Sequence, residues 1–323
     1  AGIMSVKREI LVTVPNRLHM FTTRAQFNVN NMTGGVGISV DTNQKMLVKI
    51  SENSDQHKVP NKCIGYFCDL FKTRVEFPNY FEVNYENKLR PHCGYGTTVS
   101  QISALCVALN NLLGLPFTDV DLRKMIMENY CEQHGDQLIR GLETGVGPAC
   151  SLYGGINMVV NTGSYIHMDL PKDIWVATFI PEHEAYRRSI SLDEEIGQQS
   201  RSLQADEESL DERNALLYGK YIPAMLYQNW EELGKLTQQI HSMGLKKIEC
   251  ERFDYMFQDR LIKKMLDSGA LIAGLSSLGP LNYFLARENE IENIIAVLEK
   301  RGLATNVSRY PISAKGVCVI DGE

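Results

Sequence analysis

The segment Pro91–Thr98, which reads PHCGYGTT, constrains the fold more than any other part of the chain. It follows a strand-like run at Phe81–Tyr85. It precedes apolar residues at three- and four-residue spacing over Thr97–Leu113, which predict a buried helix. Glycines let backbone amides approach an anion closely, and a helix N-terminus presents unpaired N–H groups with partial positive charge. The order of strand, glycine-rich turn and helix is therefore typical of a phosphate-binding turn, although a purely structural turn has the same pattern.

Neither of the two common nucleotide-binding motifs is present at this turn. Pro91–Thr98 lacks the lysine of G-x-x-x-x-G-K-[ST], and it does not open a βαβ unit as G-x-G-x-x-G does. P-loop and Rossmann folds are therefore disfavoured. The hydroxyl groups of Thr97 and Thr98 are the side-chain groups here that can donate to a phosphate or bind Mg²⁺.

A second glycine cluster covers Arg140–Gly147. It combines the cation of Arg140, the carboxylate of Glu143 and the hydroxyl of Thr144 with a flexible backbone at Gly145. Such a loop can hold an anion or Mg²⁺, and a plain turn is the alternative.

A third cluster, Gly274–Pro280, follows the apolar run Ala270–Ala273 and precedes a helical pattern that ends at Leu298. We therefore expect a second strand-to-helix phosphate turn here. Its candidate ligand-binding residues are Ser276, Ser277 and Gly279.

The fourth cluster, Thr33–Gly37, lies shortly after Asn16–His19. A hairpin between the two segments would bring Arg17 and His19 toward a ligand. A lone histidine is more often structural, so the functional interpretation of His19 depends on this combination.

Strand-like and helical patterns occur in a mixed order without a repeating βαβ unit, which predicts an α+β fold. The polar, acidic stretch Ser189–Arg213 favours a solvated helix or a mobile connection over a metal site. The strand-like runs are Ile10–Val14, Val36–Asp41, Met46–Ser51, Phe81–Tyr85, Ile156–Asn161, Trp175–Ile180 and Gly316–Ile320. Besides Thr97–Leu113, one helical pattern starts after Thr118, and others cover Ala215–Gln228, Glu231–Met243 and Tyr255–Leu266.

Charge and hydropathy exclude several classes of partner. The formal net charge of −6 provides no positive field for nucleic acid, so any phosphate must be bound locally. No apolar run approaches the roughly 20 residues that cross a bilayer, and we expect a cytoplasmic protein with no membrane partner. The eight cysteines form no C-x-x-C pair and are expected to be reduced.

The order of these motifs resembles the GHMP small-molecule kinase superfamily, which has a glycine-serine phosphate turn after the first sheet and a late glycine-serine turn. Within it, the chain is similar over nearly its whole length to the β-ribofuranosylaminobenzene 5′-phosphate synthase family. The matching segments are Arg17–His19, Gly34–Gly37, His92–Gly96, Arg140–Gly147, Gly154–Gly155, Ile180–Glu182, Gly274–Pro280 with Tyr283, and Ser313–Gly316.

This resemblance implies a GHMP-kinase fold, sheet-rich in its N-terminal half, with two GHMP-type domains over residues 1–180 and 181–323. It implies a homodimer, and a C-ribosyltransferase that joins ribose 5-phosphate from phosphoribosyl pyrophosphate (PRPP) to a carbon of an aromatic or heteroaromatic carboxylic acid. Pyrophosphate and CO₂ would leave, and Mg²⁺ would assist.

The resemblance also assigns roles to individual residues. It implies catalytic roles for Arg17, His19, Arg140 and Glu143, and Mg²⁺ binding by Glu143 and Thr98. The residues expected at the PRPP phosphates are Gly34, Gly35, Gly94, Gly96, Thr97, Thr98, Thr144, Gly145, Ser276, Ser277 and Gly279.

Between Arg17 and Gly34 the chain departs from the synthase pattern. The family leads us to expect an acidic residue and later an arginine, where this chain has Arg24 and Asn31. We therefore assign Arg24 and Asn31 to the acceptor, and we expect Arg24 to favour a dicarboxylate such as a pyrazole dicarboxylic acid.

Two other functions remain open at this point. An ATP-dependent GHMP kinase is one, but glycine occupies the place in Thr144–Gly147 where many such kinases have an aspartate base. A non-catalytic small-molecule-binding paralogue is the other.

Overall fold

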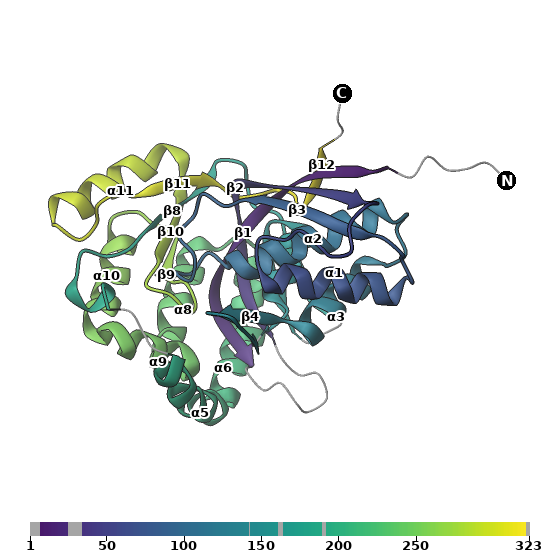
Figure 1. The fold of residues 1–323 in the computed structure, drawn as a ribbon. Coiled ribbons are helices and arrows are strands. Elements are labelled where there is room, and N and C mark those ends of the chain that lie inside the picture. Colours follow the sequence, from purple (N-terminus) through teal and green to yellow (C-terminus); the bar gives the residue numbers. More distant parts are fainter. Residues whose placement is uncertain (1–6, 25–33, 142, 161–163, 189–191, 321–323) are drawn as a thin grey trace.

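The computed structural model describes residues 7–24, 34–141, 143–160, 164–188 and 192–320. Its largest sheet is antiparallel, with the strand order β12 (Cys318–Ile320), β1 (Glu9–Arg24), β2 (Gly34–Ser51), β6 (Ile156–Val159) and β7 (Tyr165–Met168). A further strand, β3 (Tyr80–Glu86), pairs with the second half of β2. Figure 1 shows the long strands β1 and β2 running through the molecule. The predicted sheet-rich N-terminal part is thus confirmed.

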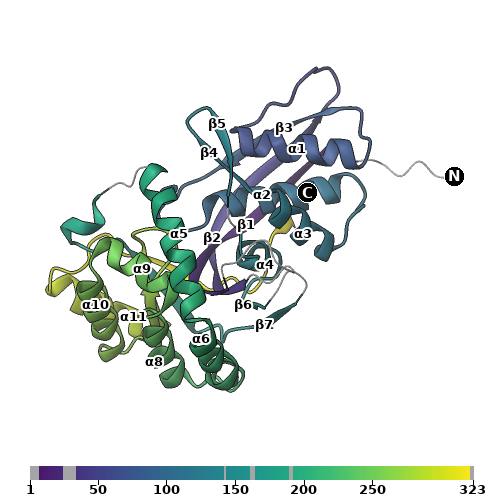
Figure 2. The ribbon, with the colours of Figure 1, turned by 90° about the horizontal axis from the view of Figure 1, so that it is seen from below.

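The helices α1 (Lys62–Arg74), α2 (Thr97–Leu112) and α4 (Val146–Tyr153) contact this sheet, and α3 (Asp119–Asn129) packs against α2 and α4. Figure 2 shows them together on one side of the molecule. The predicted buried helix is α2, and twelve of its sixteen residues are buried. A short ribbon of β4 (Cys131–His134) and β5 (Gln137–Arg140) connects α3 to the loop before α4.

The second sheet has the order β11 (Ser308–Pro311), β8 (Ile174–Phe179), β10 (Asn282–Arg287) and β9 (Ile272–Leu275). The helices α8 (Trp230–Ile240) and α10 (Tyr255–Asp267) pack against β9, and α11 (Glu288–Lys300) packs against β8 and β10. One apolar core joins the two sheets, with Leu18 and Val36 from the large sheet and Ile272 from the small one.

The remaining helical segments follow a 3₁₀ turn, η1 (Glu184–Tyr186). They are α5 (Leu192–Glu208), α6 (Leu210–Leu216), the π-helical turn η2 (Leu217–Tyr221), α7 (Ile222–Leu226) and α9 (Gly244–Phe253). The predicted solvated helix corresponds to α5 and α6. Its end is nevertheless tied to the core, because Asp206 and Arg213 form a buried ion pair at 2.8 Å.

The α+β fold class is confirmed. Strands from both sides of residue 180 share each sheet, since β12 pairs with β1 and β8 pairs with β10. The division into domains at residue 180 stays a prediction. No helix in the described ranges is long and apolar enough to cross a membrane. All eight cysteines are free.

One predicted element is wrong. Gly274–Pro280 connects β9 to β10, two antiparallel neighbours in which Leu275 pairs with Asn282, rather than a strand to a helix. The helix α11 begins only at Glu288. The turn therefore offers no helix N-terminus to a phosphate.

Candidate active site

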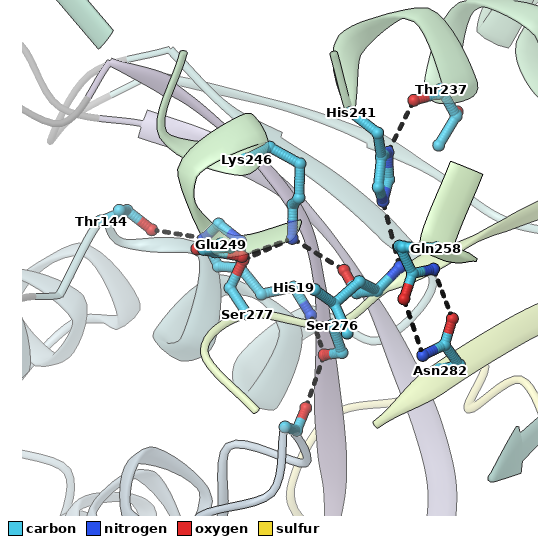
Figure 3. Close-up of polar contacts among 12 residues, drawn as sticks. His19, Thr144, Thr237, His241, Lys246, Glu249, Gln258, Ser276, Ser277 and Asn282 are labelled. Atoms are coloured by element: carbon cyan, nitrogen blue, oxygen red, sulfur yellow. Dashed lines mark hydrogen bonds and ion pairs between the residues drawn. The ribbon is translucent and has the colours of Figure 1, made fainter. Parts of the chain in front are cut away.

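The four glycine segments meet at one place in the fold. Ser276, in the turn between β9 and β10, donates its hydroxyl to the carbonyl of Gly94 at 2.6 Å and accepts from the backbone N–H of His19 at 3.0 Å (Figure 3). The same turn approaches the backbone at Cys93 so closely that a Cβ on Gly279 would lie 1.9 Å from the Cys93 carbonyl oxygen. Segments far apart in the sequence thus enclose one centre.

Arg17 lies on β1 beside the turn before α2. Its backbone N–H donates to the carbonyl of Tyr95 at 3.1 Å, and its Nη1 donates to the carbonyl of Ser277 at 3.1 Å. Its guanidinium covers Gly96, where a Cβ would lie 2.8 Å from Nε. Because Nε is buried without a hydrogen-bond partner among the described residues, this cation keeps an unused donor at the turn.

The N-terminus of α2 has no side-chain cap from the part of the chain that the structure describes. Gly96 is the N-cap residue with φ of +60°, and it offers no side chain to the first-turn amides. Thr97 is buried and Thr98 is half-buried in this first turn. The parts expected of an anion cradle, namely helix N-terminal amides, hydroxyl groups and a nearby cation, therefore lie together at this turn, and phosphate binding there stays a prediction.

His19 is buried between the glycine segments. Its Nε2 lies 3.2 Å from the Thr144 hydroxyl, and its Nδ1 is buried with no hydrogen-bond partner in the ranges that the structure describes. Burial, and then the positive charges of Arg17 and Lys246, hold the pKa of His19 well below its usual range. The imidazole is therefore neutral at physiological pH.

Glu143 caps α4 rather than facing solvent. Its Oε1 accepts from the backbone N–H groups of Gly145 at 3.0 Å and Gly147 at 3.2 Å. Burial raises the pKa of this carboxyl, and the charge of Arg17 opposes that rise. A Cβ on Gly147 would lie 2.7 Å from the Val99 side chain and 3.1 Å from Glu143 Oε2, so the carboxylate lies beside the first turn of α2.

Within the described residues, no group of three or more His, Cys, Asp or Glu side chains is arranged to hold a metal ion. Mg²⁺ does not require one, because it commonly binds through one or two carboxylates together with substrate phosphates. A single carboxylate, Glu143, beside the hydroxyl-bearing first turn of α2 fits that kind of site.

A buried ion pair behind the turn was missed by the sequence reasoning. Lys246 on α9 donates to Glu249 Oε2 at 2.9 Å, to the Leu275 carbonyl at 2.7 Å and to the Ser277 hydroxyl at 2.7 Å (Figure 3). Neither residue lies in a glycine motif. The helix also shows no clear apolar face, because part of its buried face is charged.

The strand side of the turn is held by two further polar contacts. His241 Nδ1 donates to the Thr237 carbonyl at 2.7 Å, and its Nε2 accepts from the backbone N–H of Leu275 at 3.0 Å. Gln258 and Asn282 exchange amide hydrogen bonds of 2.7 and 3.2 Å (Figure 3). These contacts fix the hairpin that carries Ser276.

Arg140 and Arg24 each contact a group outside the centre formed by Arg17, His19 and Glu143. Arg140 is exposed at the end of β5, where its Nη2 donates to the Glu128 carbonyl at 3.3 Å. Arg24 lies at the end of β1 with Nη2 3.9 Å from Glu207 Oε1. Asn31 lies outside the described residues.

Close packing alone explains why Gly34 and Gly35 are glycines, and their predicted contact with phosphate stays a prediction. A Cβ on Gly34 would lie 2.0 Å from the Val159 carbonyl oxygen, and one on Gly35 would lie 3.1 Å from His19 Cε1. Glycine is therefore required for close approach at both positions. The hydroxyls of Ser276 and Ser277 are likewise engaged within the protein, so a direct role of either with phosphate stays a prediction.

The chain is similar to two curated archaeal proteins named β-ribofuranosylphenol 5′-phosphate synthase. It is 24% identical to the one from Methanothermobacter thermautotrophicus, over 91% of this chain and 94% of the relative. It is 23% identical to the one from Archaeoglobus fulgidus, over 85% of this chain and 87% of the relative. This chain is a relative of these synthases. No protein-family model matches it.

Solved structures identify the fold as the GHMP-kinase fold. A homoserine kinase from Cytophaga hutchinsonii superposes with a TM-score of 0.66 at 17% identity, covering 99% of this chain and 100% of that one. A mevalonate diphosphate decarboxylase from Staphylococcus aureus superposes with a TM-score of 0.70 at 13% identity, covering 97% and 98%. The fold and the synthase resemblance predicted from the motifs are both confirmed.

Proposed function

We propose that this relative of the synthases is a C-ribosyltransferase that joins ribose 5-phosphate from PRPP to a carbon of an aromatic or heteroaromatic carboxylic acid. One observation carries the proposal: Arg17, His19 and Glu143 converge with the uncapped N-terminus of α2 at a single centre. The likeness to the curated synthase from Methanothermobacter thermautotrophicus, which extends over 91% of this chain, supports the proposal.

The donor's phosphate groups would bind at Gly94–Thr98. The free amides of α2 and the hydroxyls of Thr97 and Thr98 donate to phosphate oxygens, and the unused Nε donor of Arg17 faces the same turn. Glu143 and Thr98 would hold Mg²⁺, which neutralises charge on the departing pyrophosphate when it is bound.

In the proposed reaction an aryl carbon attacks the anomeric carbon of the ribose, and the anomeric C–O bond to pyrophosphate breaks. The ring then loses its carboxylate as CO₂, and the electrons of that C–C bond restore aromaticity. A neutral His19 suits this chemistry, because a cation there would oppose the positive charge that develops at the anomeric carbon.

Arg24 would select the acceptor, as the sequence predicts. It lies five residues beyond His19 on β1, about 16 Å along a strand of ordinary rise. A carboxylate bound by Arg24 must therefore be the one on the end of the acceptor that does not react. Otherwise the acceptor must extend along β1 toward His19. We further propose that the enzyme acts as a homodimer in the cytoplasm.

Mass spectrometry of reaction products tests the proposal. The protein is incubated with PRPP, Mg²⁺ and a panel of benzoic and pyrazole carboxylic acids, with EDTA and Arg17→Ala reactions as controls. The expected product has the mass of the acceptor with its CO₂H group replaced by a ribosyl 5-phosphate group, and its formation depends on Mg²⁺ and on Arg17.

Parallel reactions with ATP and small alcohols test the kinase alternative, which the homoserine kinase likeness motivates. Phosphorylation of an alcohol without any PRPP-dependent product would replace the transferase by a kinase. A protein that binds PRPP and turns over none of these mixtures would be the non-catalytic paralogue.

A further inference from the structure

The Lys246–Glu249 pair is enclosed by protein. Both side chains are buried, and all three hydrogens of the Lys246 ammonium are used. Replacing such a pair with apolar residues of similar volume is often neutral or stabilising, because two charges have been removed from water. Stability alone therefore does not account for the pair.

Ser277 connects this pair to the proposed site. Its hydroxyl accepts from Lys246 Nζ at 2.7 Å and donates to Glu249 Oε2 at 2.9 Å (Figure 3). Its backbone N–H donates to the His19 carbonyl at 3.1 Å, and its carbonyl accepts from Arg17 Nη1 at 3.1 Å. One residue thus contacts the ion pair through its side chain and both site residues through its backbone.

We propose that Lys246, Glu249 and Ser277 are positioning residues that set the placement of Arg17 and the charge around His19. The expected loss of kcat rests on the proposed function, whereas the effect of the Lys246 charge on His19 does not. Because misplacement of a site residue by about 1 Å can reduce a rate about 100-fold, a rigid support behind the Ser276–Ser277 turn has a direct catalytic use.

The charged groups around His19 determine the sign of the expected effect. Arg17 on β1 and Lys246 on α9 both act on the pKa of His19, and Glu249 on α9 forms an ion pair with Lys246. Glu143 directly precedes Thr144, whose hydroxyl lies 3.2 Å from His19 Nε2. Lys246 contributes to the lowered pKa of His19 after burial and Arg17. Removal of the Lys246 charge therefore raises the pKa of His19, whereas Ser277→Ala leaves all of these charges in place.

The kinetic test uses the full chain and a matched control. The double variant Lys246→Met/Glu249→Leu removes both charges together, so it leaves no unpaired buried ion. We expect it to fold with a melting temperature near that of the wild type, and to lose about 100-fold in kcat with KM for PRPP changed by less than about threefold. Lys247→Met, on the exposed side of the same helix, should stay within about twofold of wild-type kcat.

The second readout is an NMR titration of the His19 side chain, assigned by comparison with His19→Gln. In Lys246→Met the titration midpoint should move up, because a positive charge near the imidazole is lost, while in Ser277→Ala it should not move although kcat falls. If Lys246→Met does not fold, Lys246→Gln, which keeps a donor to Ser277, takes its place.

Two results would overturn the inference. The first is a folded double variant with wild-type kcat. The second is a His19 midpoint that is the same with and without the Lys246 charge. A wild-type protein with no PRPP-dependent turnover would refute the proposed function instead, and the titration would then decide the inference alone.

Discussion

At the scale of single residues, Gly96 provides the sharpest test of the phosphate turn. It has φ of +60°, and a Cβ would lie 2.8 Å from the Arg17 guanidinium. Gly96→Ala should therefore weaken PRPP binding at least about tenfold, and Gly96→Val should weaken it further. Gly114→Ala is the matched control, because Gly114 has φ of +85° and, beyond its chain neighbours, no described residue has an atom within 4 Å of its Cβ position.

Both alanine variants carry the strain of a left-handed backbone, about 1–2 kcal/mol, but only Gly96→Ala displaces Arg17. Calorimetric titration of each variant with PRPP and Mg²⁺ separates the two effects. Equal affinities in Gly96→Ala and Gly114→Ala would mean that the turn before α2 is structural only.

Arg24 carries a second residue-scale prediction. If it holds the carboxylate of the acceptor that does not react, Arg24→Ala should reduce kcat/KM for a pyrazole dicarboxylate about tenfold more than for a monocarboxylate. The measurement is pyrophosphate release with each acceptor. An unchanged preference would mean that Arg24 does not select the acceptor.

The glycine motifs identified Arg17, His19 and Glu143 because each lies within or beside a turn whose geometry requires glycine. Lys246 and Glu249 could not be found in this way. Their role depends on Ser277, which is 31 and 28 residues away in the sequence. Only the packing of α9 against the hairpin brings the three together.

At the scale of elements, His241 joins α8 to β9, and burial with the nearby Lys246 charge lowers its pKa to about 3. The unfolded chain, with a pKa near 6.5, therefore binds more protons than the folded protein between pH 6.5 and pH 3. The free energy of unfolding must fall as the pH falls through this window.

Between pH 7.5 and pH 5 this effect amounts to about 2 kcal/mol for His241. His241→Asn should remove that part of the pH dependence, although it lowers stability overall by breaking the contact with Leu275. Urea unfolding at both pH values measures it. A variant with the full wild-type pH dependence would show that His241 is protonated in the folded state.

The elements themselves were largely predictable from sequence, with one instructive error. Asn282–Arg287 and Glu288–Lys300 are a strand and a helix without a loop between them. Their apolar residues merge into one helical pattern, so the strand β10 was hidden. The pairing of β10 with β8 and β9 is a tertiary effect that local periodicity does not contain.

At the scale of the whole molecule, the α+β class followed from the mixed order of strand-like and helical patterns, and the superfamily followed from the order of the glycine turns. The sheet topology did not, because β12 returns to pair with β1 from the other end of the chain. Such long-range pairings place the four turns around one centre. The central claim is that this centre binds PRPP.

Calorimetric titration of the wild-type protein with PRPP and with ATP, each with Mg²⁺, tests that claim most directly. The account predicts saturable PRPP binding and at least about tenfold weaker ATP binding, a difference of about 1.4 kcal/mol or more. ATP binding as tight as PRPP binding, or tighter, would contradict it.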